Sequence, residues 1–208
     1  MNGMVIYSII AKVYDLLDIV YFRKKNGDPR LVVLRQINHK DRVLDICTGT
    51  ASTAITIAKA GKHTSVIGID RSEAMLRVAK RKVVEQKIKN LKLCKMDATQ
   101  LKFQDKTFDK VLISLVLHEV EQETADKIIL EARRVLKDNG RLIVTEWDKP
   151  RRFMQKVMFC PIAVLEPKPY RSFIKKDMKK YFSTYGFEME KRIACDYTKV
   201  MVLKKKNK

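Results

Sequence analysis

The sequence predicts an α/β protein built on a doubly wound, mostly parallel sheet of seven strands, with a C-terminal antiparallel strand pair and an N-terminal amphipathic helix. Between residues 41 and 147, short apolar runs alternate with segments in which apolar residues recur every three or four positions. After residue 186, two strand-like runs follow each other without a helix pattern between them. The length of 208 residues suits one domain with a sizeable core.

The first 40 residues are expected to be helical. Residues 4–22 are the most apolar stretch, but Lys12, Asp15 and Asp18 interrupt it at a spacing of three, which places the charges on one stripe of an amphipathic helix. A membrane-spanning helix would tolerate these charges poorly, so none is predicted. After a turn, Pro29 is placed to begin a second helix that runs to about Ile37.

The alternating region begins with two strand–helix pairs and a third strand. The run RVLDI (42–46) predicts a buried strand, and ASTAITIAKA (51–60) predicts a helix that Gly61 stops. The run SVIGID (65–70) predicts the second strand, and Ser72 is the expected N-cap of the helix EAMLRVAKRKVVEQK. The third strand is expected in LKLCKMD (91–97).

The second half continues the pattern and then leaves it. FDKVLISLVLHEV (108–120) predicts the fourth strand and a turn, TADKIILEARRVLKDNG predicts a helix closed by Gly140, and RLIVTEW (141–147) predicts the fifth strand. Five successive strand–helix units are therefore expected, with parallel strands and helices on both faces. A helix is expected around residues 172–185, followed by two antiparallel strands joined near Asp196.

Three of the predicted strands end on an acid. Asp45, Asp70 and Asp97 each close a strand, and ligands of doubly wound sheets bind at the carboxyl ends of the strands. Each acid alone is more simply explained as a helix cap or loop residue, but three neighbouring carboxylates repel one another unless a ligand uses them. The loop CTGTA (47–51) allows close backbone approach, but it lacks the full GxGxxG pattern, which disfavours a nicotinamide-dependent dehydrogenase.

Five segments, taken in order, resemble the successive motifs of class I S-adenosylmethionine-dependent methyltransferases. They are VLDICTGTAS, GIDRSEAML, KMDATQLKF, FDKVLISLVLHEV and RRVLKDNGRLIVTEW, which together cover about residues 41–147. The segments YDLLDIVYF and TGT are most similar to the ubiquinone/menaquinone-biosynthesis methyltransferase group. The resemblance implies a Rossmann-like fold, the cofactor S-adenosylmethionine with the product S-adenosylhomocysteine, and an enzyme that transfers a methyl group.

The resemblance also implies which residues contact the cofactor. Asp45 and the backbone of Cys47, Thr48 and Gly49 would hold the methionine end. Asp70 would bind the ribose hydroxyls, and Asp97 with the Ala98 amide would bind the adenine edge. Arg71 and Met75 would flank the adenosine, and Ser114 and Leu115 would line the methyl-donating side. The sequence departs from many relatives at Cys47, where they have Gly or Ala, and at Ala51, where they have Gly.

His118 is the candidate catalytic residue. It follows the fourth strand in LHEV and would act as a general base or orient the substrate, because imidazole titrates near neutrality. The alternative is a packed histidine bonded to backbone. Cys47 has no base beside it and is expected to pack. The four cysteines lie far apart without a CxxC pair, so we predict no metal site, no disulfide framework and a cytoplasmic location.

We expect a single domain with three parts: residues 1–40 as an N-terminal helical lid, 41–148 as the cofactor-binding core, and 149–208 as an acceptor-side insert with the C-terminal strand pair. The segments outside the core are rich in Met and aromatic residues, which favours a small apolar or aromatic acceptor, such as a quinol precursor or a lipid. No Asn/Asp-Pro-Pro-aromatic motif follows the fourth strand, which counts against a nucleobase amine as the acceptor.

The net charge of +20 leaves the partners open. Residues 149–208 hold 17 Lys and Arg against 5 Asp and Glu. Such a surface suits peripheral contact with an anionic membrane, and it also leaves open an RNA methyltransferase or a non-catalytic cofactor-binding module. A lysine-rich solvated surface is the simplest alternative, and the oligomeric state is not predicted.

Overall fold

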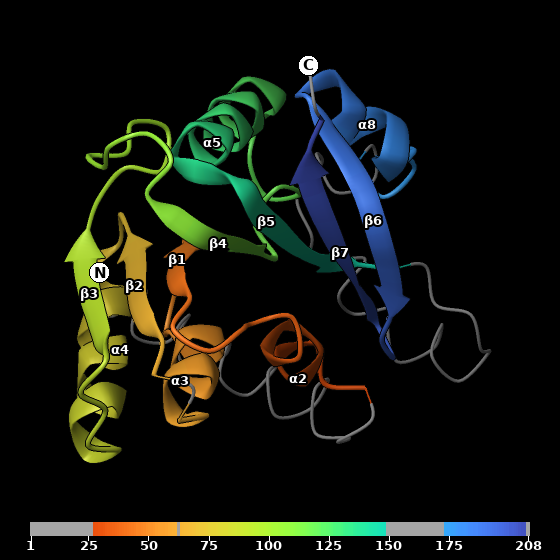
Figure 1. Cartoon of the computed structure of the whole chain (residues 1–208). Helices are drawn as coiled ribbons and strands as arrows, with labels where there is room; N and C mark the ends of the chain where they lie inside the picture. The colour runs from red at the N-terminus through yellow and green to blue at the C-terminus, as the bar shows by residue number, and fades with distance from the viewer. Residues whose placement is uncertain (1–26, 62, 149–172, 207–208) are drawn as a thin grey trace, which may run out of the picture.

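The structure is a computed structural model that describes residues 27–61, 63–148 and 173–206. A seven-stranded sheet with the order β3-β2-β1-β4-β5-β7-β6 lies between two layers of helices (Figure 1). The parallel strands are β1 (Arg42–Ile46), β2 (Ser65–Asp70), β3 (Leu91–Lys95), β4 (Phe108–Ser114) and β5 (Leu136–Trp147). The strands β6 (Phe187–Ala194) and β7 (Thr198–Lys205) form the antiparallel end of the sheet. The predicted fold class is confirmed.

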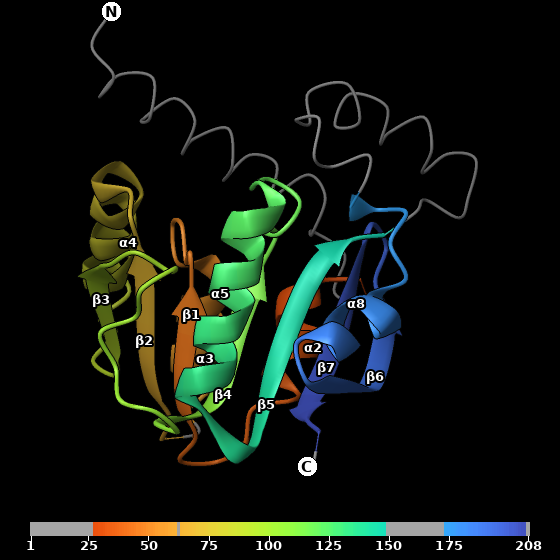
Figure 2. The ribbon, with the colours of Figure 1, turned by 90° about the horizontal axis from the view of Figure 1, so that it is seen from above.

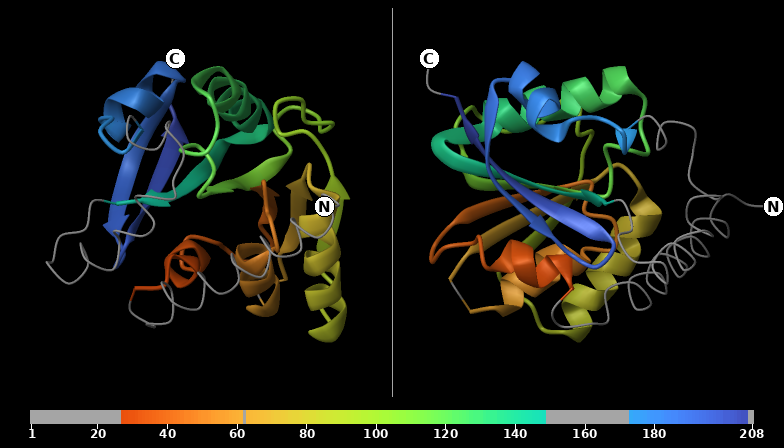
Figure 3. Two further views of the ribbon diagram at one scale, coloured as in Figure 1. Left: turned by 180° about the vertical axis from the view of Figure 1, so that it is seen from behind. Right: turned by 90° about the vertical axis from the view of Figure 1, so that its right-hand side faces the viewer.

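Helices cover both faces of the sheet, as the end-on view in Figure 3 shows. One face carries α2 (Pro29–Leu34), α3 (Ser52–Lys59) and α4 (Glu73–Glu85), and the other carries α5 (Gln122–Val135) and α8 (Met178–Thr184). Side chains cap three of these helices at the N-terminus, since Asp28, Ser72 and Asp177 each accept backbone N–H bonds of the first turn. Ser72 is the predicted cap of α4. The predicted helix at residues 4–22 lies outside the described residues.

Two apolar clusters, one on each side of the sheet, form the core. The side chains of β1 alternate between them: Val43 packs in the cluster with α2 and α3, whereas Leu44 and Ile46 pack in the cluster with α5 and α8. All three are fully buried. This two-sided burial explains why the strands appear in the sequence as continuous apolar runs.

The strand order places a switch point at β1. From β1 the chain moves outward through β2 to β3, and then returns to β4 on the other side of β1. In Figure 2 the carboxyl end of β5 lies at the upper edge of the molecule, and the connection from α5 into β5 lies at the lower edge. The carboxyl edge beside β1 is therefore the place where a doubly wound sheet binds a ligand.

The expectation of five strand–helix units is wrong at the third unit. Residues 96–107 connect β3 to β4 through turns, without a helix. Ala98 and Leu101 of this connection are buried in the cluster beneath α5, and the Phe103 ring packs edge-on against Phe108 with centroids 5.0 Å apart. The loop thus covers the sheet with its own apolar side chains, which is what a helix would otherwise do.

The role predicted for Gly140 is also wrong. Helix α5 ends at Val135, and β5 begins at the next residue, so Gly140 lies inside the strand. The pairing between β4 and β5 shifts register there, which leaves residues 137–140 as a bulge. A Cβ atom at Gly140 would lie 2.7 Å from Leu136 Cδ1 and 2.9 Å from the Asp109 carbonyl oxygen. Close approach of the chain, and not a helix end, requires glycine.

The C-terminal elements largely follow the prediction. The helix expected around residues 172–185 appears as α8, which starts only at Met178 because Asp177 caps it. The two final strands and their link near Asp196 are confirmed as β6 and β7.

We predict that Gly140→Ala destabilises the protein by about 1–3 kcal/mol, because a backbone carbonyl cannot move away from the new methyl group at low cost. Urea denaturation measures the change. Asn139→Ala is the control at the neighbouring exposed position, where we expect a change within about 0.5 kcal/mol. Equal stability of Gly140→Ala and the wild type would contradict the close-approach explanation.

Candidate active site at the carboxyl edge

Asp45 and Asp70 lie on adjacent strands at the carboxyl edge of the sheet. Asp45 is in the register pair with Gly68 of β2, and Asp70 is the last residue of β2. Asp97 follows β3 by two residues and is exposed. The three acids therefore lie along one edge, at or beside the ends of three neighbouring strands, although only Asp70 is the last residue of its strand.

The loop of residues 47–51 is held against β2. Cys47, Gly49 and Ala51 all have positive φ angles, of 53°, 57° and 63°. Thr48 donates its backbone N–H to the Ile69 carbonyl at 2.8 Å, and Ala51 donates to the Thr48 carbonyl at 2.8 Å. Among the described residues, a Cβ atom at Gly49 would meet nothing within 4 Å, so this part of the structure leaves open space in front of the loop.

The Asp70 carboxylate joins this loop to helix α4. One oxygen accepts the Gly49 N–H at 2.9 Å, and the other accepts the Ser72 N–H at 2.8 Å. The side chain is almost fully buried. Each carboxylate oxygen offers two acceptor positions, so both can still accept a hydrogen bond from a ligand.

Asp45 is the most perturbed acid of the site. It is 2% exposed, and its Oδ2 accepts the Thr48 hydroxyl hydrogen bond at 2.5 Å. Burial raises the pKa of Asp45 to about 7; the Thr48 hydroxyl opposes this rise, and the charge of Asp70 adds to it. A cationic group placed beside Asp45 would offset the cost of burying its charge.

Cys47 lies among these acids and is not activated. Burial, followed by the charges of Asp70 and Asp45, raises the pKa of the thiol to about 12. The thiolate is the nucleophilic form, so this residue packs and does not react, as the sequence predicted. The described cysteines, Cys47, Cys94 and Cys195, are all free.

Arg71 and Asp97 form the outer part of the edge. Two hydrogen bonds from Thr99, through its backbone N–H and its hydroxyl, hold the pKa of Asp97 below its usual value, and the charge of Arg71 acts in the same direction. Ala98 is buried beside it, and Met75 lies in the first turn of α4, where its N–H bonds Ser72. Both residues thus flank the acid edge.

At the end of β4 the chain turns towards the second group of candidate residues. Ser114 is the last residue of the strand, and Leu115 has a φ of 56° and donates its N–H to the Thr145 carbonyl at 2.9 Å. This turn leads directly to His118.

His118 forms a buried dyad with Glu146, a residue that the sequence reasoning did not select. The Nδ1 atom of His118 lies 2.5 Å from Glu146 Oε2, and each side chain is 1% exposed. The other Glu146 oxygen accepts the Leu117 N–H at 2.9 Å. The Trp147 ring lies 6.4 Å from the imidazole, centroid to centroid. The only sequence signal for Glu146 is an acid in the otherwise apolar run RLIVTEW.

A hollow of about 290 Å³ lies near the carboxyl end of β5, lined in part by Asp148, Met178, Met189 and Arg192. Arg192 Nη2 bonds both oxygens of Asp148, at 2.8 and 2.7 Å. The described residues contain no group of three or more His, Cys, Asp or Glu that could hold a metal ion. In the same residues, no helix combines the length and apolar character needed to cross a bilayer.

Comparison with known proteins matches the part of the chain that contains the candidate site. A model of the methyltransferase domain family matches residues 37–193. The demethylmenaquinone methyltransferase of Staphylococcus saprophyticus is 36% identical over 148 residues, which cover 70% of this chain and 62% of that protein. The demethylmenaquinone methyltransferase of Bacillus subtilis is 34% identical over 189 residues, which cover 89% of this chain and 78% of that protein. The chain thus spans less than two thirds of the Staphylococcus relative.

Solved structures show the same fold at lower identity. An S-adenosylmethionine-dependent methyltransferase from Aquifex aeolicus superposes with a TM-score of 0.73 at 21% identity, over 95% of this chain and 97% of that one. The [4+2]-cyclase SpnF superposes with a TM-score of 0.68 at 15% identity, over 97% of both chains. The fold alone therefore does not determine the reaction.

We predict that the stability of the wild type, relative to Asp45→Asn, falls as the pH rises from about 4 to about 7 and then levels off. The folded pKa of about 7 lies above the ordinary 3.8, so the folded state holds the proton more tightly and loses this advantage as the proton leaves. Each unit of pKa difference corresponds to about 1.4 kcal/mol. Urea denaturation of both proteins across this range measures the difference.

Glu123→Gln is the control for that experiment. The pKa of Glu123 is lowered by its hydrogen bond with Lys127, so its contribution is complete above about pH 5 and the corresponding difference should be flat from there upwards. If the stability difference between the wild type and Asp45→Asn were also independent of pH, the assignment of a buried carboxyl with a raised pKa would be contradicted.

Proposed function

This chain belongs to the methyltransferase domain family of S-adenosylmethionine-dependent enzymes, and on that basis we propose that it transfers the methyl group to a small apolar aromatic acceptor of the quinol-precursor type. The observation that carries the proposal is the pair Asp45 and Asp70, joined through the loop of residues 47–51 at the switch point of the sheet. The names of the relatives, demethylmenaquinone methyltransferases, support the acceptor class.

The acid edge fits S-adenosylmethionine in its chemistry. When bound, the cofactor supplies an electrophilic methyl group on a sulfonium. Asp45 would hold the methionine end, because a buried carboxylate with a raised pKa suits an ammonium group. Asp70 would accept the ribose hydroxyls with its remaining acceptor positions, and Asp97 with Ala98 would hold the adenine edge.

The loop of residues 47–51 would contribute shape more than hydrogen-bond donors. The N–H groups of Thr48 and Gly49 are already bonded to Ile69 and Asp70. The loop would instead leave room for the cofactor in front of Gly49. The positive φ angles of Cys47, Gly49 and Ala51 give the backbone the tight turn that leaves this room. The same hydrogen bonds keep the loop in one conformation, so little order has to be gained on binding.

The protein's part in the reaction is to align the acceptor and exclude water, because methyl transfer is an in-line displacement. We propose His118 as the base that takes the acceptor's proton. With Glu146 ionised, Nδ1 carries the proton of the dyad and Nε2 is the basic nitrogen, and the Leu117 N–H fixes the carboxylate in place. Glu146 is then a positioning residue, which acts through His118.

A membrane-bound or lipid-like acceptor remains part of the proposal. The net charge of residues 149–208 and the apolar residues 4–22 favour an amphiphilic acceptor met at an anionic surface. Residues 4–22 and 149–172 lie outside the described residues, so this part is supported by composition alone. RNA is the competing acceptor, and its binding would fall steeply with salt.

We predict that Asp97→Asn weakens binding of S-adenosylhomocysteine by about tenfold to a hundredfold, the cost of losing a hydrogen bond to a charged group. The amide can keep the bonds to Thr99, but it turns one acceptor towards the adenine into a donor. Isothermal titration calorimetry measures the affinity. Asp105→Asn, in the same loop and equally exposed, removes the same charge and should change the affinity less than about twofold. If the two substitutions changed the affinity equally, the assignment of Asp97 to the adenine edge would be rejected.

We predict methyl transfer from labelled S-adenosylmethionine to a reduced demethylated naphthoquinone, and a loss of kcat of roughly 10²–10⁴ in His118→Gln. Glu146→Gln should also lower kcat and change the pH–rate profile, because an amide does not stabilise a protonated imidazole. In both variants the dissociation constant of S-adenosylhomocysteine should stay within about twofold of the wild type, since neither residue contacts the acid edge.

Three outcomes would overturn parts of this assignment. Transfer to RNA but not to the quinol would reject the proposed acceptor, and cofactor binding without transfer to either would indicate a binding module. A Glu146→Gln enzyme with an unchanged pH profile would reject the positioning role, whatever its stability.

A further inference from the structure

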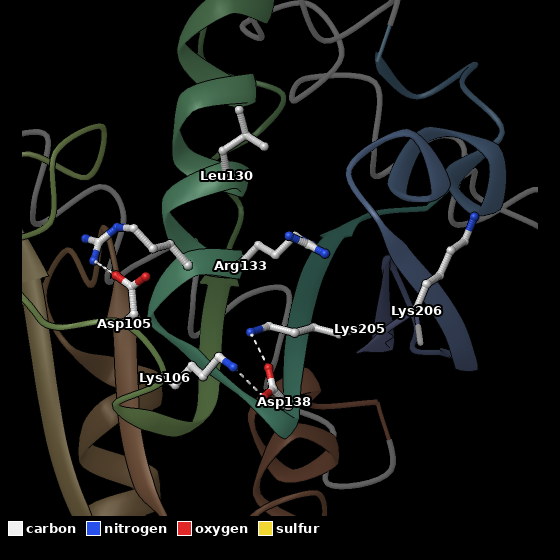
Figure 4. A pocket seen from close by; sticks show the side chains of 8 residues that line it. Asp105, Lys106, Leu130, Arg133, Asp138, Lys205 and Lys206 are labelled. Atoms are coloured by element: carbon white, nitrogen blue, oxygen red, sulfur yellow. Dashed lines mark hydrogen bonds and ion pairs between the residues drawn. The ribbon is translucent and has the colours of Figure 1, made fainter. Parts of the chain in front are cut away.

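A second hollow lies at the edge of the sheet opposite the acid edge. It has a volume of about 630 Å³, within the range of small-molecule sites, and Figure 4 shows it between the last turns of α5 and the start of β5. The lining residues are Asp105, Lys106, Leu130, Arg133, Arg134, Asp138, Lys205 and Lys206. None of them belongs to the proposed cofactor site.

The hollow holds more positive charge than its acids neutralise. Five of its lining residues are Lys or Arg and two are Asp. Asp105 is bonded to Arg134, which Glu131 also holds. Asp138 serves two lysines, at 2.7 Å from Lys106 and 3.4 Å from Lys205. Both acids are therefore already in use.

Arg133 has no such partner. It lies in the last turn of α5, and no hydrogen bond or ion pair to its guanidinium occurs in the described part of the chain; its Nε atom is buried without an acceptor. The side chain is held by packing, because a Cβ atom at Gly186 would lie only 2.9 Å from Nε. Figure 4 shows it reaching from α5 across the hollow towards β5 and β7.

Lys205 extends into the same space from the other side. Its side chain is 12% exposed, and Nζ donates to the Leu136 carbonyl at 2.5 Å. Burial lowers the pKa of Lys205; the hydrogen bond and charge of Asp138 oppose this, and the charges of Arg133 and Lys106 add to the lowering. Three cations thus share this space with the single carboxylate of Asp138, and their donor N–H groups outnumber the acceptors.

We propose that this hollow binds a phosphoryl group, with Arg133 as the principal donor and Lys205 and Lys106 beside it. A doubly charged anion suits a hollow with three more cations than acids, and a guanidinium fork matches the geometry of phosphate oxygens. Leu130, one turn of α5 away and 53% exposed, offers an apolar contact for the rest of the ligand. A soluble phosphate ester and a phospholipid headgroup both present this chemistry.

The test is a titration of the whole chain with pyrophosphate, followed by calorimetry and by the NMR signals of the arginine Nε–H groups. We expect saturable binding, a shift of one arginine Nε–H signal that is absent in Arg133→Gln, and at least about tenfold weaker binding in that variant. Lys127→Gln is the matched control, because it removes one positive charge from the exposed surface of the same helix. It should bind within about twofold of the wild type.

Vesicles separate the two sources of the group. Binding to phosphatidylglycerol but not phosphatidylcholine vesicles, lost in Arg133→Gln, supports a headgroup, and tight binding of the soluble anion supports a phosphate ester. Absence of both, or equal loss in Arg133→Gln and Lys127→Gln, overturns the proposal. Arg133→Gln should keep its melting temperature without phosphate and its affinity for S-adenosylhomocysteine. The test of the phosphoryl site is therefore independent of the test of the proposed function.

Discussion

The candidate active site depends above all on one buried carboxylate. Asp70 accepts the N–H of Gly49 with one oxygen and the N–H of Ser72 with the other, and so connects the loop after β1 to the start of α4. Without it, two part-buried donors would lose their acceptor, and the loop, which keeps three residues at positive φ, would be held only by its bonds to Ile69 and within itself. Burial is the main cause of the raised pKa of Asp45, and the charge of Asp70 adds to it, so the same side chain shapes the loop and contributes to the electrostatics of the edge.

Elements that depend on local pattern were predictable, and elements that depend on distant contacts were not. The strand at residues 65–70 and the cap at Ser72 follow from an apolar run and a hydroxyl before an acidic first turn. Gly140 was misassigned as a helix end, since KDNG has the composition of one. Its true constraint is the Asp109 carbonyl of the neighbouring strand, 31 positions earlier in the chain. Five successive strand–helix units were expected, but the connection at residues 96–107 covers the sheet with apolar side chains of a loop, which no local pattern distinguishes.

In the candidate active site, too, residues set by local pattern were predictable and a residue set by a distant contact was not. The positions of Asp45, Asp70 and Asp97 along one edge follow from strand ends and parallel pairing, and the structure has them there. Glu146 could not be selected, because its meaning comes from His118, 28 positions away, and from the pairing of β4 with β5. The sequence offered a backbone-bonded histidine as the alternative; the structure has a carboxylate at Nδ1, and the proposed role of His118 as a base starts from this arrangement.

Acidic and basic side chains gather at different places along the edges of the sheet. The carboxyl edge gathers Asp45, Asp70 and Asp97, which suits a cofactor with a sulfonium and an ammonium group, whereas the opposite edge gathers Lys106, Arg133 and Lys205. An anionic ligand would therefore be attracted to the hollow at Arg133 and repelled from the three acids. A protein with a net charge of +20 can thus hold a cationic cofactor, because local acids and not the total charge decide what binds at each edge. If both proposals hold, a phosphoryl group bound at the basic edge would orient the protein while leaving the acid edge free for chemistry.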